Sequence, residues 1–317
     1  MKQPDGNITP DIPLDAKLRE RLRGILLPFP TPFGADGEVD VCALRDNIAR
    51  WNRTGVSGYV ALGSTGERVH LDERERAAVV EAARAAVPEG LAFVVGVGEH
   101  GTRATVNEAR RAARAGADAL LVITPHFYRG VMGGEALRAH FEAVADASPA
   151  PVILYNIPQN TGVALAPEVA ARLSEHENVV GLKDSSGDVV NLMETIRLVG
   201  AARADFVVTT GHAAVLYPAL AAGAGGAILA AACAVPRLCV EIFEAVAAGD
   251  HERARRMQAR LAPVARAVTV GYGIGGLKAA LDLLGYHGGP VREPLRPPDE
   301  RARREIAELL KAVDSSQ

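Results

Sequence analysis

Short apolar runs rich in β-branched residues recur along the chain, and each is followed by a turn and then by a segment with helical spacing. The runs are apolar throughout rather than alternating with polar residues, which is typical of parallel strands covered by helices on their outer face. Eight runs are present, at residues 25–29, 58–62, 92–97, 119–123, 152–155, 179–182, 206–209 and 226–229. The pattern therefore predicts an α/β fold.

The segments between these runs are rich in Ala, Arg and Glu and begin with capping residues or proline. They predict helices at residues 72–86, 102–115, 135–147, 167–174 and 188–199. The eight repeats have a similar amino-acid composition along the chain. This favours a closed (β/α)8 TIM barrel over an open sheet, which would show fewer units and a topological switch point.

Beyond residue 235 the pattern becomes purely helical, with helices predicted at residues 241–248, 251–267, 275–285 and 299–313. The chain begins with a polar, proline-rich stretch that lacks the basic and apolar segments of a signal peptide or anchor. We therefore predict three parts: an N-terminal arm at 1–20, a barrel at 21–234 and a C-terminal helical layer at 235–317.

Charge and cysteine content exclude several classes of protein. The 317 residues carry 35 basic and 38 acidic side chains, so no electrostatic signal for nucleic acid or an anionic membrane is present. Three cysteines without a CxxC pair predict no disulfide framework and a cytoplasmic location. The uncharged stretch 213–236 is mostly Ala and Gly and contains Pro218, so a membrane span is not expected.

Chemistry in a barrel is expected where the strands end at their C-terminal edge. Among the five lysines only Lys183 closes a strand-like run. Desolvation lowers the pKa of a lysine and frees the amine to attack ketones. The alternative is a lysine that leans outward and pairs with Asp184. Tyr155 ends the preceding run, where a phenol can relay protons, unless it is a core tyrosine.

A second candidate element is the turn that follows the second run, with the sequence Gly63-Ser-Thr-Gly-Glu67. Ser64 and Thr65 supply hydroxyls, and the closely spaced backbone N–H groups suit a carboxylate. A turn of this kind also occurs as a plain connection, so the motif alone is weak.

Glycine and histidine patterns indicate neither a nucleotide nor a metal. Residues 96–101 read GVGEHG after a strand, but the acidic residue expected at the end of the next strand is absent, and residues 271–276 follow a helix. The eight histidines contain no HxxxH pair, although His126 and His212 follow strands and are candidates to line a site. We expect no cofactor and no metal.

Taken together, the motifs resemble the dihydrodipicolinate synthase and N-acetylneuraminate lyase family. The resemblance covers nearly the whole chain and is carried by PFPTPF at 28–33, GSTGE at 63–67, Thr124-Pro125, YNIP at 155–158 and GLKD at 181–184. Members of this family are metal-free, Schiff-base-forming lyases and aldolases built on barrels, and they are commonly homotetramers.

The resemblance implies roles for individual residues. Lys183 would form an imine with a 2-oxo acid, pyruvate or its adduct, and the protonated imine would act as the electron sink. Tyr155 and Ser64 would relay protons, and Thr65 with the turn amides at Gly63 would hold the carboxylate. Two further positions would line the pocket: Gly211 and Ile228.

Two positions depart from the family pattern. Lysine-biosynthetic members carry an arginine two residues after the YNxP proline, where this chain has Asn160. The usual interfacial tyrosine is replaced by Phe127, and the neighbouring Tyr128 is a candidate substitute.

Several stretches instead look like 4-hydroxy-2-oxoglutarate aldolase: residues 127–130, 145–155, 160–162, 183–188, 273–278 and 285–295. We therefore predict a class I aldolase that releases pyruvate from a 4-hydroxy-2-oxo acid, with Arg129 as an anchor for the distal carboxylate. Three alternatives stay open: a 4-hydroxy-tetrahydrodipicolinate synthase condensing pyruvate with aspartate semialdehyde, a sugar-acid dehydratase, and a non-catalytic barrel.

Overall fold

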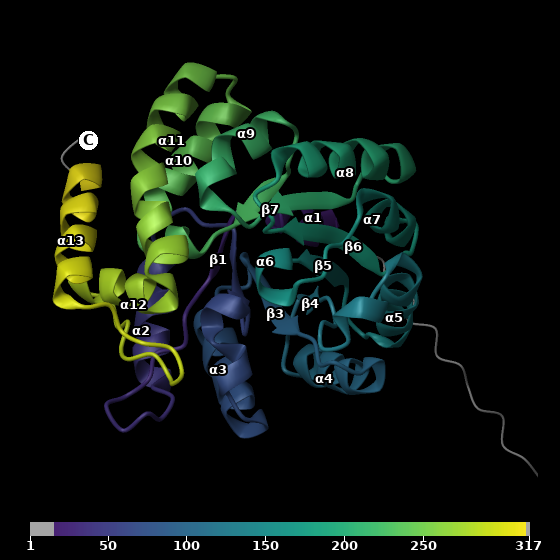
Figure 1. Cartoon of the computed structure of the whole chain (residues 1–317), viewed down its shortest axis with the longest axis horizontal. Coiled ribbons are helices and arrows are strands. Elements are labelled where there is room, and N and C mark those ends of the chain that lie inside the picture. Colours follow the sequence, from purple (N-terminus) through teal and green to yellow (C-terminus); the bar gives the residue numbers. More distant parts are fainter. Residues whose placement is uncertain (1–15, 315–317) are drawn as a thin grey trace, which may run out of the picture.

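The computed structural model describes residues 16–314 and contains a closed barrel of eight parallel strands arranged in sequence order. The last strand pairs with the first and closes the barrel (Figure 1). The strands are β1 (Gly24–Pro28), β2 (Gly58–Ala61), β3 (Ala92–Val97), β4 (Ala119–Ile123), β5 (Val152–Asn156), β6 (Val179–Asp184), β7 (Val207–Thr210) and β8 (Gly226–Ile228). The predicted TIM barrel is confirmed.

Helices alternate with the strands; most form the outer layer of the barrel, while α1 lies at its N-terminal mouth and α6 at the opposite mouth. They are α1 (Ala16–Arg21), α2 (Val41–Trp51), α3 (Glu73–Ala86), α4 (Thr102–Arg114), α5 (Gly134–Ala147), α6 (Pro158–Thr161), α7 (Pro167–Ser174), α8 (Val189–Ala202) and α9 (Leu216–Ala221). Capping residues in the sequence mark the start of several of these helices. Asp72, for example, caps α3 in a reciprocal capping box with Glu75.

Four more helices follow the barrel: α10 (Pro236–Ala247), α11 (His251–Arg266), α12 (Gly273–Leu283) and α13 (Glu300–Asp314). Figure 1 shows them gathered on one side of the barrel. A π-helical segment, Ala267–Gly271, joins α11 to α12. This segment and the chain after α12 bring the C-terminal part of the protein to the mouth of the barrel.

Most predicted strand boundaries lie within one or two residues of the observed ones, and those of β3 and β4 coincide. Five helices were predicted less well, and among them α1, α6 and α9 were not predicted at all. The helix α2 was not predicted, although Leu44, Ile48 and Trp51 are buried at helical spacing. The helix predicted at 241–248 begins earlier, because Pro236 occupies its first turn, where its missing N–H needs no partner.

The helix α1 covers the N-terminal mouth of the barrel. Residues 1–15 of the predicted arm lie outside the described residues, and residues 16–20 belong to α1. Leu18 and Leu22 are buried and join the cluster that fills the barrel interior, with Leu26, Val60 and Leu121. Burial of these leucines closes one mouth, so the opposite mouth is the accessible one.

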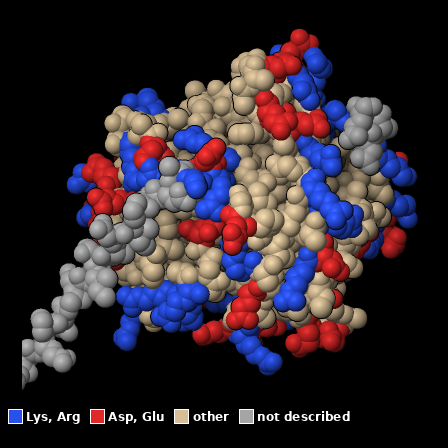
Figure 2. Space-filling view, turned by 180° about the vertical axis from the view of Figure 1, so that it is seen from behind, with Lys and Arg blue, Asp and Glu red and all other residues tan. Residues whose placement is uncertain are grey.

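The charged side chains of the surface are mixed in sign. Figure 2 shows basic and acidic residues interspersed on the face opposite to that of Figure 1. Between residues 16 and 314, no helix combines the length and the apolar character needed to cross a membrane. The uncharged stretch 213–236 is divided among short helices and β8.

Between α4 and α5 lies a buried histidine that couples stability to pH. His140 is 5% exposed, and its Nδ1 lies 2.9 Å from the Thr102 hydroxyl. Burial lowers the pKa of His140 to about 4 from an ordinary value of 6.5. Between these two pH values the unfolded chain binds a proton that the folded chain does not bind, so stability falls as the pH falls.

We expect the free energy of unfolding to decrease by about 3 kcal/mol as the pH drops from 6.5 to about 4 because of this group. The variant His140→Gln keeps a partner for Thr102 but does not titrate, so its stability should depend less on pH over this interval. Urea unfolding of both proteins at several pH values measures the difference. Parallel pH profiles would contradict the assignment.

Candidate active site

A cavity of about 300 Å³ opens at the C-terminal mouth of the barrel. Residues from six strand ends or the loops after them reach it, because parallel strands all end at the same mouth. The predicted site residues that line it are Ser64, Thr65, Tyr155, Asn160, Lys183, Gly211 and Ile228. Residues far apart in the sequence are thus brought to one place.

Lys183 lies near the end of β6, where it is paired with Tyr155 on one side and Thr209 on the other. It is 4% exposed, and its Nζ lies 4.4 Å from the centre of the Tyr155 ring. Neighbouring strand residues point to opposite faces, so Asp184 points away from Lys183. The Asp184 carboxylate instead accepts hydrogen bonds from Asn156 at 2.9 Å and from Ser186 at 2.8 Å.

Lys183 therefore has no carboxylate partner among residues 16–314. The alternative considered from the sequence, an ion pair with Asp184, does not form in this structure. A buried amine held against an aromatic ring is suited to nucleophilic attack when it is deprotonated.

Tyr155 connects the lysine to the turn after β2. Its hydroxyl lies 3.3 Å from Ser64 Oγ, within hydrogen-bonding distance. The three side chains of Ser64, Tyr155 and Lys183 therefore form a continuous row from β2 across to β6. Such a row can carry a proton between a bound molecule and the serine hydroxyl.

The turn itself has an unusual backbone. Residues Ser64–Gly66 form one turn of 3-10 helix, which is closed by a hydrogen bond from Gly66 N to Gly63 O at 3.0 Å. The residues on either side, Leu62 and Glu67, have φ of 55° and 53° and are the non-glycine residues with positive φ in the described chain. Such conformations are unfavourable and persist where the surrounding structure imposes them, commonly at functional sites.

Gly211 leaves room for the lysine. A β-carbon at this position would lie 2.8 Å from Lys183 Cε and would also collide with Ser185 Oγ. Any larger residue would therefore displace one of these side chains. The packing of these side chains therefore explains why the residue after β7 is a glycine.

Some predicted residues lie outside this cavity. Gly63 starts the turn and borders a neighbouring cavity, which also shares Ser64, Tyr155 and Asn160. Tyr128 is 70% exposed and packs edge to face on Phe127. Arg129 packs over Gly162, where a β-carbon would lie 2.8 Å from its Cδ.

Other residues reach the cavity without having been predicted. Gln159 donates a hydrogen bond to the Ser185 carbonyl, and both residues line the cavity. Ser185 lies two residues after Lys183, so strand alternation could have indicated it. Thr269 and Val270 come from the π-helical segment, and nothing in the local sequence marks them. His212, which was a candidate, also lines the cavity.

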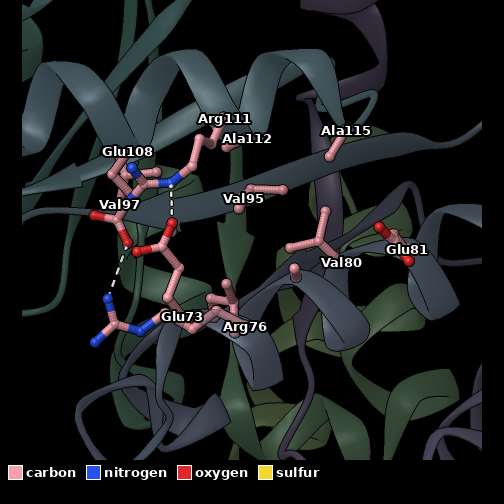
Figure 3. Close-up of a pocket in the computed structure, with 13 residues that line it drawn as sticks. Glu73, Arg76, Val80, Glu81, Val95, Val97, Glu108, Arg111, Ala112 and Ala115 are labelled. Carbon is pink, nitrogen blue, oxygen red and sulfur yellow. Dashed lines mark hydrogen bonds and ion pairs between the residues drawn. The ribbon is translucent and has the colours of Figure 1, made fainter.

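A separate groove lies on the outside of the barrel between α3 and α4, and Figure 3 shows its lining. Its floor is apolar, and ion pairs join the two helices at its rim, at 3.3 Å between Arg111 and Glu73 and at 3.4 Å between Arg76 and Glu108. None of the predicted site residues lines this groove. The predicted site residues therefore gather at the mouth of the barrel and not in this groove.

Comparison with known proteins agrees with this geometry. Residues 21–313 match the model of the dihydrodipicolinate synthetase family. The chain belongs to this family. A 4-hydroxy-tetrahydrodipicolinate synthase from Methanothrix thermoacetophila is 38% identical over 288 residues, which cover 91% of this chain and 96% of that protein. The family resemblance and the prediction of a carbon–carbon lyase are thereby confirmed.

Solved structures of the family are similar throughout. A monomeric dihydrodipicolinate synthase variant superposes with a TM-score of 0.90 at 29% identity, covering 94% of this chain and 99% of that one. YagE, a prophage protein from E. coli K12 solved in complex with pyruvate, has a TM-score of 0.86 at 30% identity and covers 92% and 98% of the two chains.

The steric argument at Gly211 yields a test of the site. We expect Gly211→Ala to lower the rate at which pyruvate is trapped on Lys183 by borohydride by about tenfold or more, because the added methyl group displaces the amine. The control is Gly200→Ala on α8, where nothing lies within 4 Å of the added carbon. Trapping is measured by intact mass, with circular dichroism to verify folding. Equal trapping in both variants would show that the lysine does not depend on this space.

Proposed function

We propose that this member of the family is a class I aldolase that cleaves a 4-hydroxy-2-oxo acid, such as 4-hydroxy-2-oxoglutarate, to pyruvate and an aldehyde. The observation that carries the proposal is the buried, carboxylate-free amine of Lys183 against the Tyr155 ring. An amine in these surroundings can form a Schiff base with a ketone.

The chemistry follows from this amine. Lys183 attacks C2 of the 2-oxo acid, and loss of water gives a protonated imine. Removal of the proton from the 4-hydroxyl breaks the C3–C4 bond, the aldehyde leaves, and the electron pair passes to the imine nitrogen as an enamine. Protonation at C3 and hydrolysis then release pyruvate and restore the amine. Tyr155, with Ser64 at 3.3 Å, is placed to move these protons.

The turn after β2 supports the binding of a 2-oxo acid. Thr65 lines the cavity together with Lys183, and the backbone N–H groups of Ser64 and Thr65 lie in the same turn, whereas that of Gly66 is bonded to the Gly63 carbonyl. Convergent N–H groups and hydroxyls favour a carboxylate. In our proposal they hold the C1 carboxylate, with Gly211 and Ile228 forming the walls around the imine.

The residues at the far side of the cavity favour the aldolase reaction. The side chain of Asn160, on α6, is neutral where the synthases of lysine biosynthesis carry an arginine for the aldehyde substrate. In our proposal Arg129, which packs over Gly162 two residues later, supplies the positive charge for a distal carboxylate.

A second candidate is the synthase reaction, in which the pyruvate enamine attacks the aldehyde of aspartate semialdehyde. The 38% identity to the 4-hydroxy-tetrahydrodipicolinate synthase from Methanothrix thermoacetophila favours it. Both candidates share the imine and differ in the second partner. Turnover of the two different substrates therefore distinguishes the candidates, and trapping of pyruvate does not.

We expect the protein to release pyruvate from 4-hydroxy-2-oxoglutarate and to gain the mass of a reduced pyruvate adduct on Lys183 when borohydride is added. Pyruvate is measured with a coupled reductase, and peptide mapping locates the adduct. Lys183→Ala should abolish both signals. Asp188→Asn, which alters a helix cap outside the cavity, is the matched control.

Trapped pyruvate with consumption of aspartate semialdehyde but no cleavage of the hydroxy acid would select the synthase. No adduct on a folded protein in excess pyruvate would reject the lysine mechanism for both candidates.

We also propose that the protein is a cytoplasmic homotetramer. Large apolar side chains remain exposed beside the mouth of the barrel, where Phe127 is 68%, Tyr128 70% and Val131 69% exposed. Exposed patches of this kind are typical of protein interfaces. Sedimentation equilibrium should give a mass of about four chains. A single-chain mass would overturn the proposal, and a four-chain mass unaffected by Phe127→Glu would show that the interface does not include this patch.

A further inference from the structure

The charged pair next to the carboxylate-binding turn is the most deeply buried ion pair in the described chain. Glu67, the residue that ends the turn, lies 2.6 Å from Nζ of Lys278 on α12. The lysine side chain is 1% exposed and the glutamate side chain is fully buried. Two residues separated by more than 200 positions therefore meet directly behind the turn.

The surroundings of the pair come mostly from the C-terminal part of the chain. Lys278 also donates a hydrogen bond to the Pro290 carbonyl at 2.6 Å and lies 4.2 Å from the centre of the Phe33 ring. The second carboxylate oxygen of Glu67 accepts a hydrogen bond from the backbone N–H of Arg292 at 3.0 Å. Both oxygens of this glutamate are thus held by residues that follow the barrel.

One further titratable group approaches the glutamate. Nδ1 of His70 lies 3.4 Å from the oxygen that Arg292 also contacts. Burial lowers the pKa of Lys278, and the adjacent Glu67 carboxylate opposes this shift by favouring the ammonium form. The short distance between the two charges supports a charged pair rather than a neutral one.

A gain in the free energy of unfolding does not by itself account for such a buried ion pair. Removing two charges from water is unfavourable, and apolar residues of similar size often stabilise a protein at least as well. The pair instead contacts a turn whose backbone conformation is unfavourable. Glu67 has a φ of 53°, and the neighbouring Gly66 carbonyl is held from the other side by the Thr31 hydroxyl at 2.7 Å.

The same backbone presents the groups of the cavity. Ser64 and Thr65 lie within three residues of Glu67 and line the cavity with Lys183. A change of φ at Glu67 would rotate the preceding peptide groups and displace both hydroxyls. One short turn therefore links the buried ion pair to the residues that line the cavity.

We propose that Glu67 and Lys278 are positioning residues, through which the C-terminal helices hold the turn in the shape that binds the carboxylate of the 2-oxo acid. This inference rests on the proposed function and extends it, because it makes substrate affinity depend on a contact outside the cavity. Neither residue contacts the reacting atoms, so the expected effect is on the pyruvate concentration needed for imine formation and not on the amine itself.

The test uses the full chain and three variants: Glu67→Gln, Lys278→Met and the double variant. Each single variant leaves one buried charge without its partner and should be destabilised, whereas the double variant removes both charges and should recover stability. Thermal unfolding measures stability. Borohydride trapping over a range of pyruvate concentrations, read by intact mass, gives the half-saturating concentration.

We expect the half-saturating pyruvate concentration of the double variant to stay raised by about tenfold or more even though its stability recovers. The amount of adduct at saturating pyruvate should remain close to that of the unaltered chain. This separation distinguishes positioning from a structural role, in which stability and pyruvate binding would recover together. The double variant also keeps the test valid if the single variants fail to fold.

The matched control is an exposed ion pair of the same chemistry, Glu194 with Arg197 on α8, whose side chains are 42% and 65% exposed. Glu194→Gln with Arg197→Met should change neither stability nor trapping. If the double variant at 67 and 278 binds pyruvate as the unaltered chain does, the positioning role is refuted while the proposed function stands. If the unaltered chain itself traps no pyruvate, both fail.

Discussion

Closure of the parallel sheet is the constraint on which the rest of this structure depends. Because all eight strands run in one direction and β8 pairs with β1, every strand ends at the same mouth. Side chains separated by more than one hundred positions, such as Ser64 and Lys183, therefore line one cavity. The other mouth is filled by Leu18 of α1 and by Leu22, which directly follows this helix.

Within that mouth the arrangement depends on burial of charge. The Lys183 amine lies against the Tyr155 ring and forms no ion pair with a described carboxylate, whereas Asp184 is satisfied by Asn156 and Ser186 on the other face of the strand. The second buried lysine, Lys278, has a carboxylate partner in Glu67. Two buried lysines of one chain thus have opposite surroundings, and those surroundings suit one to react and the other to hold a turn.

The strand–helix order was predictable because each unit carries its own local pattern. Runs of β-branched residues, capping residues such as Asp72 and the following amphipathic segments predicted the barrel and most boundaries. The failures have local causes as well. The helix α2 is separated from β1 by the loop 29–40, and α10 starts at a proline within an apolar stretch, where the helical periodicity is obscured.

The sequence by itself determined the order of elements and the identity of the strand-end residues, because propensity, periodicity and capping act within a few residues. Only the tertiary structure decided which of those residues meet. It placed Thr269 and Val270 at the cavity, left Tyr128 exposed, set Arg129 over Gly162 and joined Glu67 to Lys278. These contacts join distant parts of the chain, and their energies depend on the shape and burial of the assembled molecule, which no local pattern records.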